Sequence, residues 1–456
     1  MNVTLKIYHK LPPSIRGIAA SIHGAKLNFL RYSRLTPKLI SEARERESWS
    51  FDQWQAWRQD QLSSLLRSAS LHVPYYRDYW KGQAGASVVS DIQNWPILEK
   101  QVVRDYPERF VSDLSRGSKL YCTHTSGSTG SPMKIIWSAE TARKWYALVE
   151  ARWRNWYGVT RFNRWAIIGG KQVVPPSAQK PPYWVYNHGM NQLYMSAYHL
   201  SCDSAADYVQ ALKAHRIQFI HTYTSGIYSL ARFITDLGIS PPQLKVIVIN
   251  AEPIYDHQRE LIEFVFQCPV RETYGMAEMV AGAGECDTGH LHLWPDAGYM
   301  EVDAGNENVL TSGTGQLIAT GLVNFDMPLI RYRVGDSVTL SEQVETCSCG
   351  RSMPVLSSVE GRNDDLLKTK DGREIGRLDT IFKSSYPILE AQIVQKTLDL
   401  CVLRLVPTPG YSDVVAVEIS NELKALMGPI RVEVKLVEAI PRGANGKFRA
   451  VLCEVK

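Results

Sequence analysis

Between about residue 118 and residue 340, short apolar segments alternate with segments of helical periodicity. The apolar segments are rich in β-branched residues and are short enough to be buried strands. They are RWAIIGG (164–170), IQFIHTY (217–223), KVIVIN (245–250) and GQLIATGL (315–322). The helical segments between them are 204–216, 224–238 and 256–267. This alternation is typical of an α/β fold with mostly parallel sheets and flanking helices.

The pattern changes at both ends of the chain. Ser50 is a suitable N-cap for a helix that buries Trp54 and Leu65 and ends before Pro74. After Gly361 the segments indicate a small α+β unit. We therefore predict a large N-terminal domain over residues 1–362 and a small C-terminal domain over residues 363–456.

The first 45 or so residues combine basic side chains with apolar ones at roughly helical spacing. The apolar residues are Ile15, Ile18, Ile22, Leu27 and Leu30. Two interpretations stay open. The segment is either a helix packed against its own domain, or a basic amphipathic surface that contacts a membrane or a partner.

Composition excludes several classes of protein. The net charge is only +5, from 51 Lys+Arg against 46 Asp+Glu, which argues against a nucleic-acid partner. The sequence contains neither an apolar run of 18 residues nor a secretory signal, which argues against a membrane span and against export. Eight cysteines are too few for a disulfide scaffold, so we expect a reducing, cytoplasmic location.

Four residues of metal-binding types gather late in the large domain. Cys286, His292, Cys347 and Cys349 can together supply a Cys₃His set for a structural zinc ion, with His290 as a reserve ligand. Four protein ligands leave no open position, so we assign this metal no catalytic role. The alternative is a group of reduced thiols without a metal. The other five cysteines are predicted to be buried apolar residues.

A run of hydroxyl groups and glycines spans residues 125–130. Such a loop lets backbone N–H groups and hydroxyls approach a phosphate closely. It is neither a P-loop nor a dinucleotide-binding G-x-G-x-x-G. Its composition alone is equally compatible with an ordinary surface loop.

Five ordered motifs resemble those of the AMP-forming acyl-activating superfamily. They are Thr125-Ser-Gly-Ser-Thr-Gly-Ser-Pro132, Thr273-Tyr-Gly-Met-Ala-Glu278, Tyr332-Arg-Val-Gly-Asp336, Gly361-Arg-Asn-Asp-Asp365 and Pro441-Arg-Gly-Ala-Asn-Gly-Lys447. The segments His72-Val-Pro-Tyr-Tyr-Arg77 and Cys347-Ser-Cys-Gly-Arg351 resemble the phenylacetate–CoA ligase branch, and especially its relatives in capsular-polysaccharide gene sets.

The resemblance implies an enzyme that joins a small-molecule carboxylate to AMP and then to an acceptor. Its cofactors are ATP, Mg²⁺ and CoA. The loop residues Thr125, Ser126, Gly127, Ser128, Thr129 and Gly130 are expected to hold the β- and γ-phosphates, with Lys134 nearby. Glu278 is expected to bind Mg²⁺, a hard cation that prefers oxygen ligands. Lys447 is expected to bridge the carboxylate and the α-phosphate.

The same resemblance places the nucleoside. The residues expected to line it are Asn250, Ala251, Glu252, Tyr274, Gly275 and Met276, with Tyr274 stacked on adenine. Asp336 is expected to accept hydrogen bonds from the ribose, and Arg362 to stay near it. Asp364 corresponds to the hinge about which the small, mobile domain rotates between the two reaction steps. His124 and His221 are candidates for the carboxylate pocket or, equally, for core histidines.

Two departures from the family pattern keep the second step open. Many members have a lysine where Met133 stands, and residues 368–376, where CoA would pass, contain fewer glycines than usual. The acceptor is therefore CoA or, alternatively, an amine or amino sugar. A second alternative is a nucleotide-binding scaffold without turnover. The branch resemblance also implies a homodimer.

Overall fold

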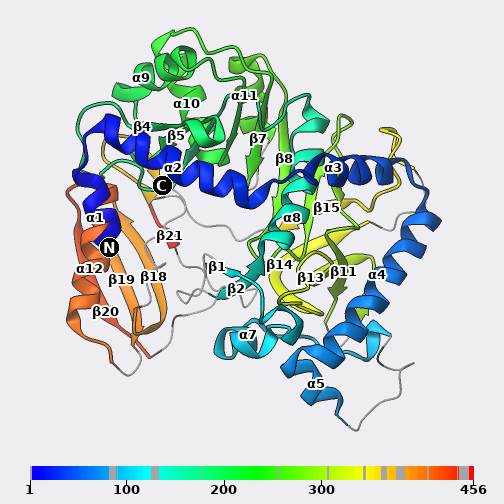
Figure 1. The fold of residues 1–456 in the computed structure, drawn as a ribbon. Helices are drawn as coiled ribbons and strands as arrows, with labels where there is room; N and C mark the ends of the chain where they lie inside the picture. Colours follow the sequence, from blue (N-terminus) through cyan, green and yellow to red (C-terminus); the bar gives the residue numbers. More distant parts are fainter. Residues whose placement is uncertain are drawn as a thin grey trace.

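The structure is a computed structural model that describes residues 3–81, 89, 91–124, 133–175, 177–252, 254, 256–305, 308–341, 346–360, 367–375, 386–407, 410–438, 440 and 451–455. Its N-terminal part is helical (Figure 1). The helices are α1 (Val3–Lys10), α2 (Pro13–Arg31), α3 (Thr36–Glu45), α4 (Phe51–His72) and α5 (Pro74–Trp80). As predicted, Ser50 caps α4, in a reciprocal pair of hydrogen bonds with Gln53, and α4 ends before Pro74. Pro74 begins a further helix, α5.

An eight-stranded sheet forms the centre of the large domain. Its strand order is β10-β9-β8-β7-β6-β3-β5-β4, and the inner strands β8, β7, β6, β3 and β5 run parallel. The strands are β3 (Trp165–Gly169), β4 (Trp184–Asn187), β5 (Gln192–Ser196), β6 (Phe219–Thr222), β7 (Val246–Asn250), β8 (Val270–Gly275), β9 (Gly282–Glu285) and β10 (Leu291–Leu293). The helices that follow the strands are α8 (Ala139–Arg152), α9 (Cys202–Ala214), α10 (Thr224–Leu237) and α11 (Asp256–Phe266). The α/β fold is confirmed.

A second sheet of five strands is antiparallel throughout. Its order is β12-β11-β13-β14-β15, from β11 (Gly298–Asp303), β12 (Val309–Leu310), β13 (Gly313–Gly321), β14 (Tyr332–Leu340) and β15 (Leu356–Glu360). The apolar segment at 315–322 lies in β13, so the expectation that it joins a parallel sheet is wrong. A continuous apolar run indicates a buried strand but does not specify the direction of the neighbouring strand.

A small helix and a hairpin precede the central sheet. They are α7 (Lys100–Asp105) and the antiparallel pair β1 (Leu120–His124) and β2 (Lys134–Ser138). His124 lies directly opposite Lys134 in this pair. The two ends of the segment that contains residues 125–130 are therefore neighbours.

The C-terminal part is a small α+β unit, as predicted. A hairpin of β16 (Leu367–Lys368) and β17 (Glu374–Ile375) precedes a sheet of order β20-β19-β18-β21. That sheet consists of β18 (Ile388–Thr397), β19 (Leu400–Pro407), β20 (Arg431–Leu436) and β21 (Val451–Cys453), and α12 (Asp413–Met427) packs on it through Ile419 and Leu423. The predicted boundary at 362/363 lies outside the described residues and stays a prediction. Among the described helices, none is both long and apolar enough to cross a membrane.

Candidate active site

The predicted nucleoside-binding residues lie at the carboxyl ends of two neighbouring parallel strands. Asn250 ends β7, and Tyr274 and Gly275 end β8. Asn250 pairs with Thr273, so these strand ends lie side by side. Ligands of open α/β sheets bind outside the carboxyl ends of the strands. The sheet therefore assembles these residues where a ligand crevice is expected.

Two local features at the end of β7 fit a ligand-binding site. The buried Asn250 Oδ1 atom has no hydrogen-bond partner in the described part of the chain. A buried polar atom without a partner costs roughly 1–3 kcal/mol, which a bound ligand can relieve. Ala251 has a φ of 63°, a left-handed conformation that is uncommon for a residue with a side chain. Such strained residues concentrate at functional sites.

Tyr274 and Asp336 connect the two large sheets. The Tyr274 hydroxyl donates a hydrogen bond of 2.7 Å to Asp336 Oδ2, which projects from β14. This contact brings two of the sequence motifs together and fixes the ring relative to the carboxylate. A Cβ atom at Gly275 would lie 3.0 Å from the Trp153 ring, so glycine lets β8 approach that ring. Tyr274 and Asp336 thus meet between the two sheets.

Glu278 is buried and has two partners that the sequence does not reveal. Its Oε1 atom accepts a hydrogen bond of 3.1 Å from the Tyr332 hydroxyl and lies 3.3 Å from Lys100 Nζ. Tyr332 belongs to a recognised motif, but the motif suggested no role for it. Lys100 comes from α7, in a segment without any recognisable signal. The carboxylate is therefore held in place beside an ammonium group.

Lys134 and Met133 have different environments. Met133 is buried in the core, whereas Lys134 Nζ forms an ion pair of 2.6 Å with Glu108 at the surface. That hydrogen bond raises the pKa of Lys134. A phosphate-binding role for Lys134 stays a prediction, and it requires Lys134 to leave Glu108.

Several predicted residues lie outside the described residues. They are Thr125, Ser126, Gly127, Ser128, Thr129, Gly130, Arg362, Asp364 and Lys447. Their proposed roles rest on the motifs alone. Ala251, Glu252 and Met276 are described and lie next to the strand ends, where the Glu252 carbonyl accepts a hydrogen bond of 3.3 Å from Thr224.

His221 lies on β6, in the same sheet. Burial and the nearby Arg154 lower its pKa to about 3, so the ring is neutral at physiological pH. It meets the Trp153 ring edge-on at 5.7 Å between centroids, and its Nε2 atom has no hydrogen-bond partner in the described part of the chain. The sequence left His221 open between pocket and core, and its buried, neutral ring fits either. His124, by contrast, is exposed.

Glu272 on β8 carries an unusual carboxyl group. Burial and the neighbouring Glu285 raise its pKa from 4.5 to about 7. The folded chain therefore keeps a proton that the unfolded chain releases, and stability is lost as pH rises from about 4.5 to about 7. We expect Glu272→Gln to stabilise the protein at pH 8 by about 1–3 kcal/mol, with no gain at pH 4.5. Thermal unfolding across this pH range measures the difference.

The exposed Glu260 on α11 provides the control. Glu260→Gln removes the same charge from the same region of the sheet and is expected to leave the pH profile unchanged. An equal gain from both variants would show that net charge, rather than the environment of Glu272, sets the profile.

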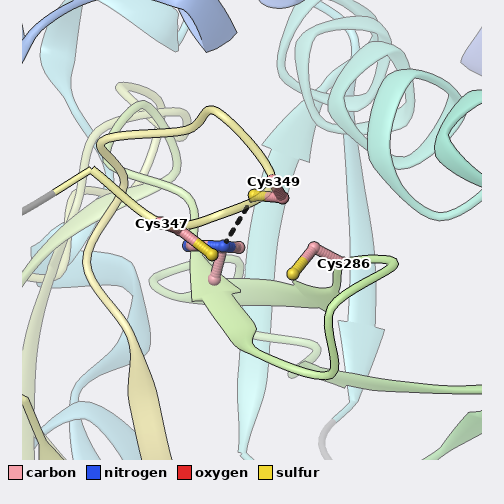
Figure 2. Close-up of side chains that lie close together, drawn as sticks. Cys286, Cys347 and Cys349 are labelled. Carbon is pink, nitrogen blue, oxygen red and sulfur yellow. Dashed lines mark hydrogen bonds between the residues drawn. The ribbon is translucent and has the colours of Figure 1, made fainter.

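The four predicted metal ligands lie together. The donor atoms of Cys286, His292, Cys347 and Cys349 are all within 4.8 Å of one another. Cys286 follows β9 and His292 lies on β10, while the other two thiols come from the turn at 346–352. Figure 2 shows the three cysteines converging from these two segments. Cys349 Sγ lies 3.4 Å from His292 Nε2.

The surroundings orient these groups for a cation. His292 is fully buried, and its Nδ1 atom lies 3.0 Å from the Met353 carbonyl oxygen. Because a carbonyl only accepts, Nδ1 carries the hydrogen and Nε2 presents a lone pair to the thiols, as in histidine metal ligands. Burial opposes ionisation of Cys347, but hydrogen bonds from Thr288 and Cys349 outweigh it and lower the pKa of that thiol. The donor set and its geometry fit zinc.

The remaining cysteines do not all match the expectation of burial, since Cys202 and Cys453 are only half-buried. Cys268 and Cys401 are buried, as predicted, but Cys122 is exposed. The expectation for Cys122 is wrong because alternation along β1 places its side chain on the solvent side of a two-stranded hairpin.

The sequence is similar to those of several known proteins. Residues 367–454 match the family described as the CapK C-terminal domain. The chain is 25% identical to Protein CapK of Staphylococcus aureus over 459 residues, which covers 99% of both chains. It is 25% identical to the phenylacetate-coenzyme A ligase of Thermus thermophilus over 346 residues, covering 71% of this chain and 73% of the relative. The corresponding ligase of Pseudomonas putida is 27% identical and covers 68% of this chain and 72% of its own.

Solved structures share the fold. 2-Hydroxyisobutyryl-CoA ligase with 2-HIB-AMP and CoA, in the thioesterification state, matches with a TM-score of 0.59 at 20% identity, covering 90% of this chain and 92% of that one. The same ligase in the postadenylation state matches with a TM-score of 0.56 at 19% identity, covering 90% and 91%. These solved structures have the fold that the resemblance of the motifs implies.

Proposed function

We propose that this chain, an enzyme of the AMP-forming acyl-activating superfamily, activates a small-molecule carboxylate with ATP and then transfers the acyl group to CoA. The observation that carries the proposal is the juxtaposition of Asn250, Tyr274 and Asp336 between the two sheets. The orphan acceptor on Asn250 fits the amino group of adenine, and Asp336 offers a carboxylate oxygen to a ribose hydroxyl. Glu278 belongs to the same motif as Tyr274, and we propose that its carboxylate lies near the phosphates of ATP.

The chemistry consists of two substitutions. In the first, a carboxylate oxygen attacks the α-phosphorus of ATP, an O–P bond forms, and the bond to pyrophosphate breaks. In the second, the acceptor attacks the acyl carbon, the acyl–AMP bond breaks, and AMP leaves with the bonding electrons. The chain has to align these groups and stabilise the negative charge on the transferring phosphoryl group. Bound Mg²⁺ supplies charge neutralisation at the phosphates, and Glu278 is its proposed ligand.

Lys447 supplies a further positive charge in the first step. A lysine on a flexible stem can bridge the attacking carboxylate and the α-phosphate and then withdraw when the small domain rotates. Asp364 is the proposed hinge and Arg362 a ribose neighbour. In this proposal the two domains have separate roles. The sheets of the large domain hold the nucleotide, and rotation of the small domain removes Lys447 from the site and admits the acceptor.

An amine acceptor is the second candidate. The two phenylacetate–CoA ligases align with 71% and 68% of the chain, whereas Protein CapK aligns with 99% of it. The C-terminal part, through which the acceptor is expected to enter, matches the CapK C-terminal domain instead. These coverages are the reason to keep an amine or amino sugar as the alternative acceptor, and the adenylation step is common to both candidates.

Carboxylate-dependent exchange of labelled pyrophosphate into ATP tests the first step. We expect exchange with one class among aromatic, fatty and amino acids, and a loss of about 10²–10³-fold in Lys447→Ala. Lys435→Ala, which removes an exposed lysine on β20 of the same domain, is the control and is expected to retain exchange. Adding CoA or amines to the active acid then identifies the acceptor. ATP binding without exchange for any acid would favour the scaffold alternative.

A further inference from the structure

Helix α2 packs on the protein through its small residues. It lies along the edge of the eight-stranded sheet, against β4 and the 3₁₀ turn at His188–Met190 (Figure 1). A side chain at Gly24 would collide with Asn187, so glycine permits this close approach. Ser21 accepts a hydrogen bond of 3.0 Å from the His188 amide on the same face. The helix therefore does pack on its own domain, through a side that carries Ser21, Gly24 and the buried Leu30.

The apolar side of α2 faces outward instead. Ile15, Ile18, Ile22 and Phe29 are 44%, 60%, 68% and 78% exposed. At about 100° per residue, these four side chains fall within an arc of roughly 60°. Lys26 is exposed and borders the same arc. We call these five residues the α2 ridge.

The charged side chains of residues 1–41 have a single sign. Residues 1–41 contain no Asp or Glu, and their Lys and Arg residues are Lys6, Lys10, Arg16, Lys26, Arg31, Arg34 and Lys38. The rest of the chain has two more acidic than basic residues, so this segment accounts for the whole positive balance. Partial burial and the neighbouring Lys171, Lys26 and Arg31 lower the pKa of His23 on α2, which reflects the same local accumulation of cations.

A groove extends the apolar surface. It has a volume of about 750 Å³ and lies between α2 and the sheet edge. Ile18 and Ile22 form one wall, and Trp184 and Tyr186 of β4 form the other. Apolar area is therefore continuous from the α2 ridge to the aromatic side chains beside it.

We propose that the α2 ridge docks the protein on an anionic lipid surface. A helix with a narrow apolar stripe and flanking cations lies in the plane of the interface, with its apolar side inserted below the headgroups. Lys10, Lys26 and Arg34 are exposed cations of this segment, and they complement the negative potential of anionic lipids. The groove beside Trp184 provides additional apolar contact for acyl chains. This surface is separate from the site between the two large sheets.

Co-sedimentation of the full chain with vesicles tests this proposal. We expect binding to vesicles of phosphatidylcholine with about one third phosphatidylglycerol, and at least tenfold weaker binding to pure phosphatidylcholine. Each charge reversal at Lys26 or Arg34 should weaken binding about fivefold or more, because a surface cation contributes about 1 kcal/mol. Raising the salt concentration should release the protein.

Two matched variants distinguish vesicle binding by the α2 ridge from nonspecific binding through any exposed aromatic side chain. Phe29→Ser removes a side chain that is 78% exposed, and Phe264→Ser removes one on α11 that is 72% exposed. Only Phe29→Ser should reduce vesicle binding, by about tenfold, while both variants keep the melting temperature of the unmodified protein. Equal losses in both, or no binding to anionic vesicles at low salt, would overturn the proposal. Self-association that Phe29→Ser abolishes, without vesicle binding, would assign the α2 ridge to a second copy of the chain instead.

Discussion

The Glu278→Gln variant is expected to lose carboxylate-dependent ATP–pyrophosphate exchange by about 10²–10³-fold. The substitution is nearly isosteric, but it removes the negative charge that we propose binds Mg²⁺ beside the phosphates. Glutamine can still accept a hydrogen bond from Tyr332, so the loss reports on charge rather than on shape. Exchange measured over a range of Mg²⁺ concentrations is the test, and the variant should require far more Mg²⁺ than the unmodified chain.

Two comparisons separate a metal-binding role from simple ion pairing. Glu301→Gln breaks a buried ion pair of 3.1 Å with Arg331 in the five-stranded sheet, and it should leave exchange within a few-fold of normal if the protein stays folded. Lys100→Met removes the ammonium group that faces Glu278. Combined with Glu278→Gln, it should recover the melting temperature lost when the ammonium group no longer faces a carboxylate, but not the exchange activity. Recovery of exchange in the double variant would contradict the metal-binding role.

Loss of the proposed metal is expected to have the second-largest effect, on stability. The purified protein should contain about one zinc ion per chain, and Cys349→Ser should bring that content close to zero. The four ligands connect the β9–β10 hairpin to the turn at 346–352, so losing the ion releases both segments. Because removal of a structural metal is among the most destabilising changes known, we expect the melting temperature to fall by roughly 5–10 °C.

Chelation and a matched cysteine complete this test. Prolonged treatment with a chelator should lower the melting temperature of the unmodified protein to that of Cys349→Ser, and zinc should restore it. Cys401→Ser introduces a hydroxyl at a buried cysteine of the small domain, so it reports the cost of the substitution alone. It should retain the zinc. A full complement of zinc in Cys349→Ser would rule out this ligand set.

The sequence predicted the elements of the large domain well. The parallel strands β3, β6 and β7 and the three helices after them appear where short apolar runs alternate with helical periodicity. Local propensity and burial determine these elements, and both are encoded within a few neighbouring residues. Whether β13 runs parallel or antiparallel to its neighbours could not be predicted from nearby residues, because this depends on which strands pair with it.

The Cys/His cluster shows what the positions of residues in the sequence can predict about a candidate metal site. The sequence predicted that Cys286, His292, Cys347 and Cys349 come together, because thiols and imidazoles that gather in a sequence indicate a metal site. The structure adds the fixed orientation of His292 by Met353, which no spacing reveals. The proximity of these four residues was therefore predictable from the sequence, and the orientation of His292 was not.

By itself the sequence determined the α/β class, the motif order and the residue types of the proposed nucleotide site. The tertiary structure alone decided that Lys100 faces Glu278 across 178 positions of the chain, and that Tyr274 holds Asp336. It also decided that α2 turns its isoleucines outward and its glycines inward. The physical reason is that periodicity reports which side chains share a face of a helix, whereas the contact made by that face depends on the shape of a distant surface. A helix that packs through glycine leaves its apolar face for another partner.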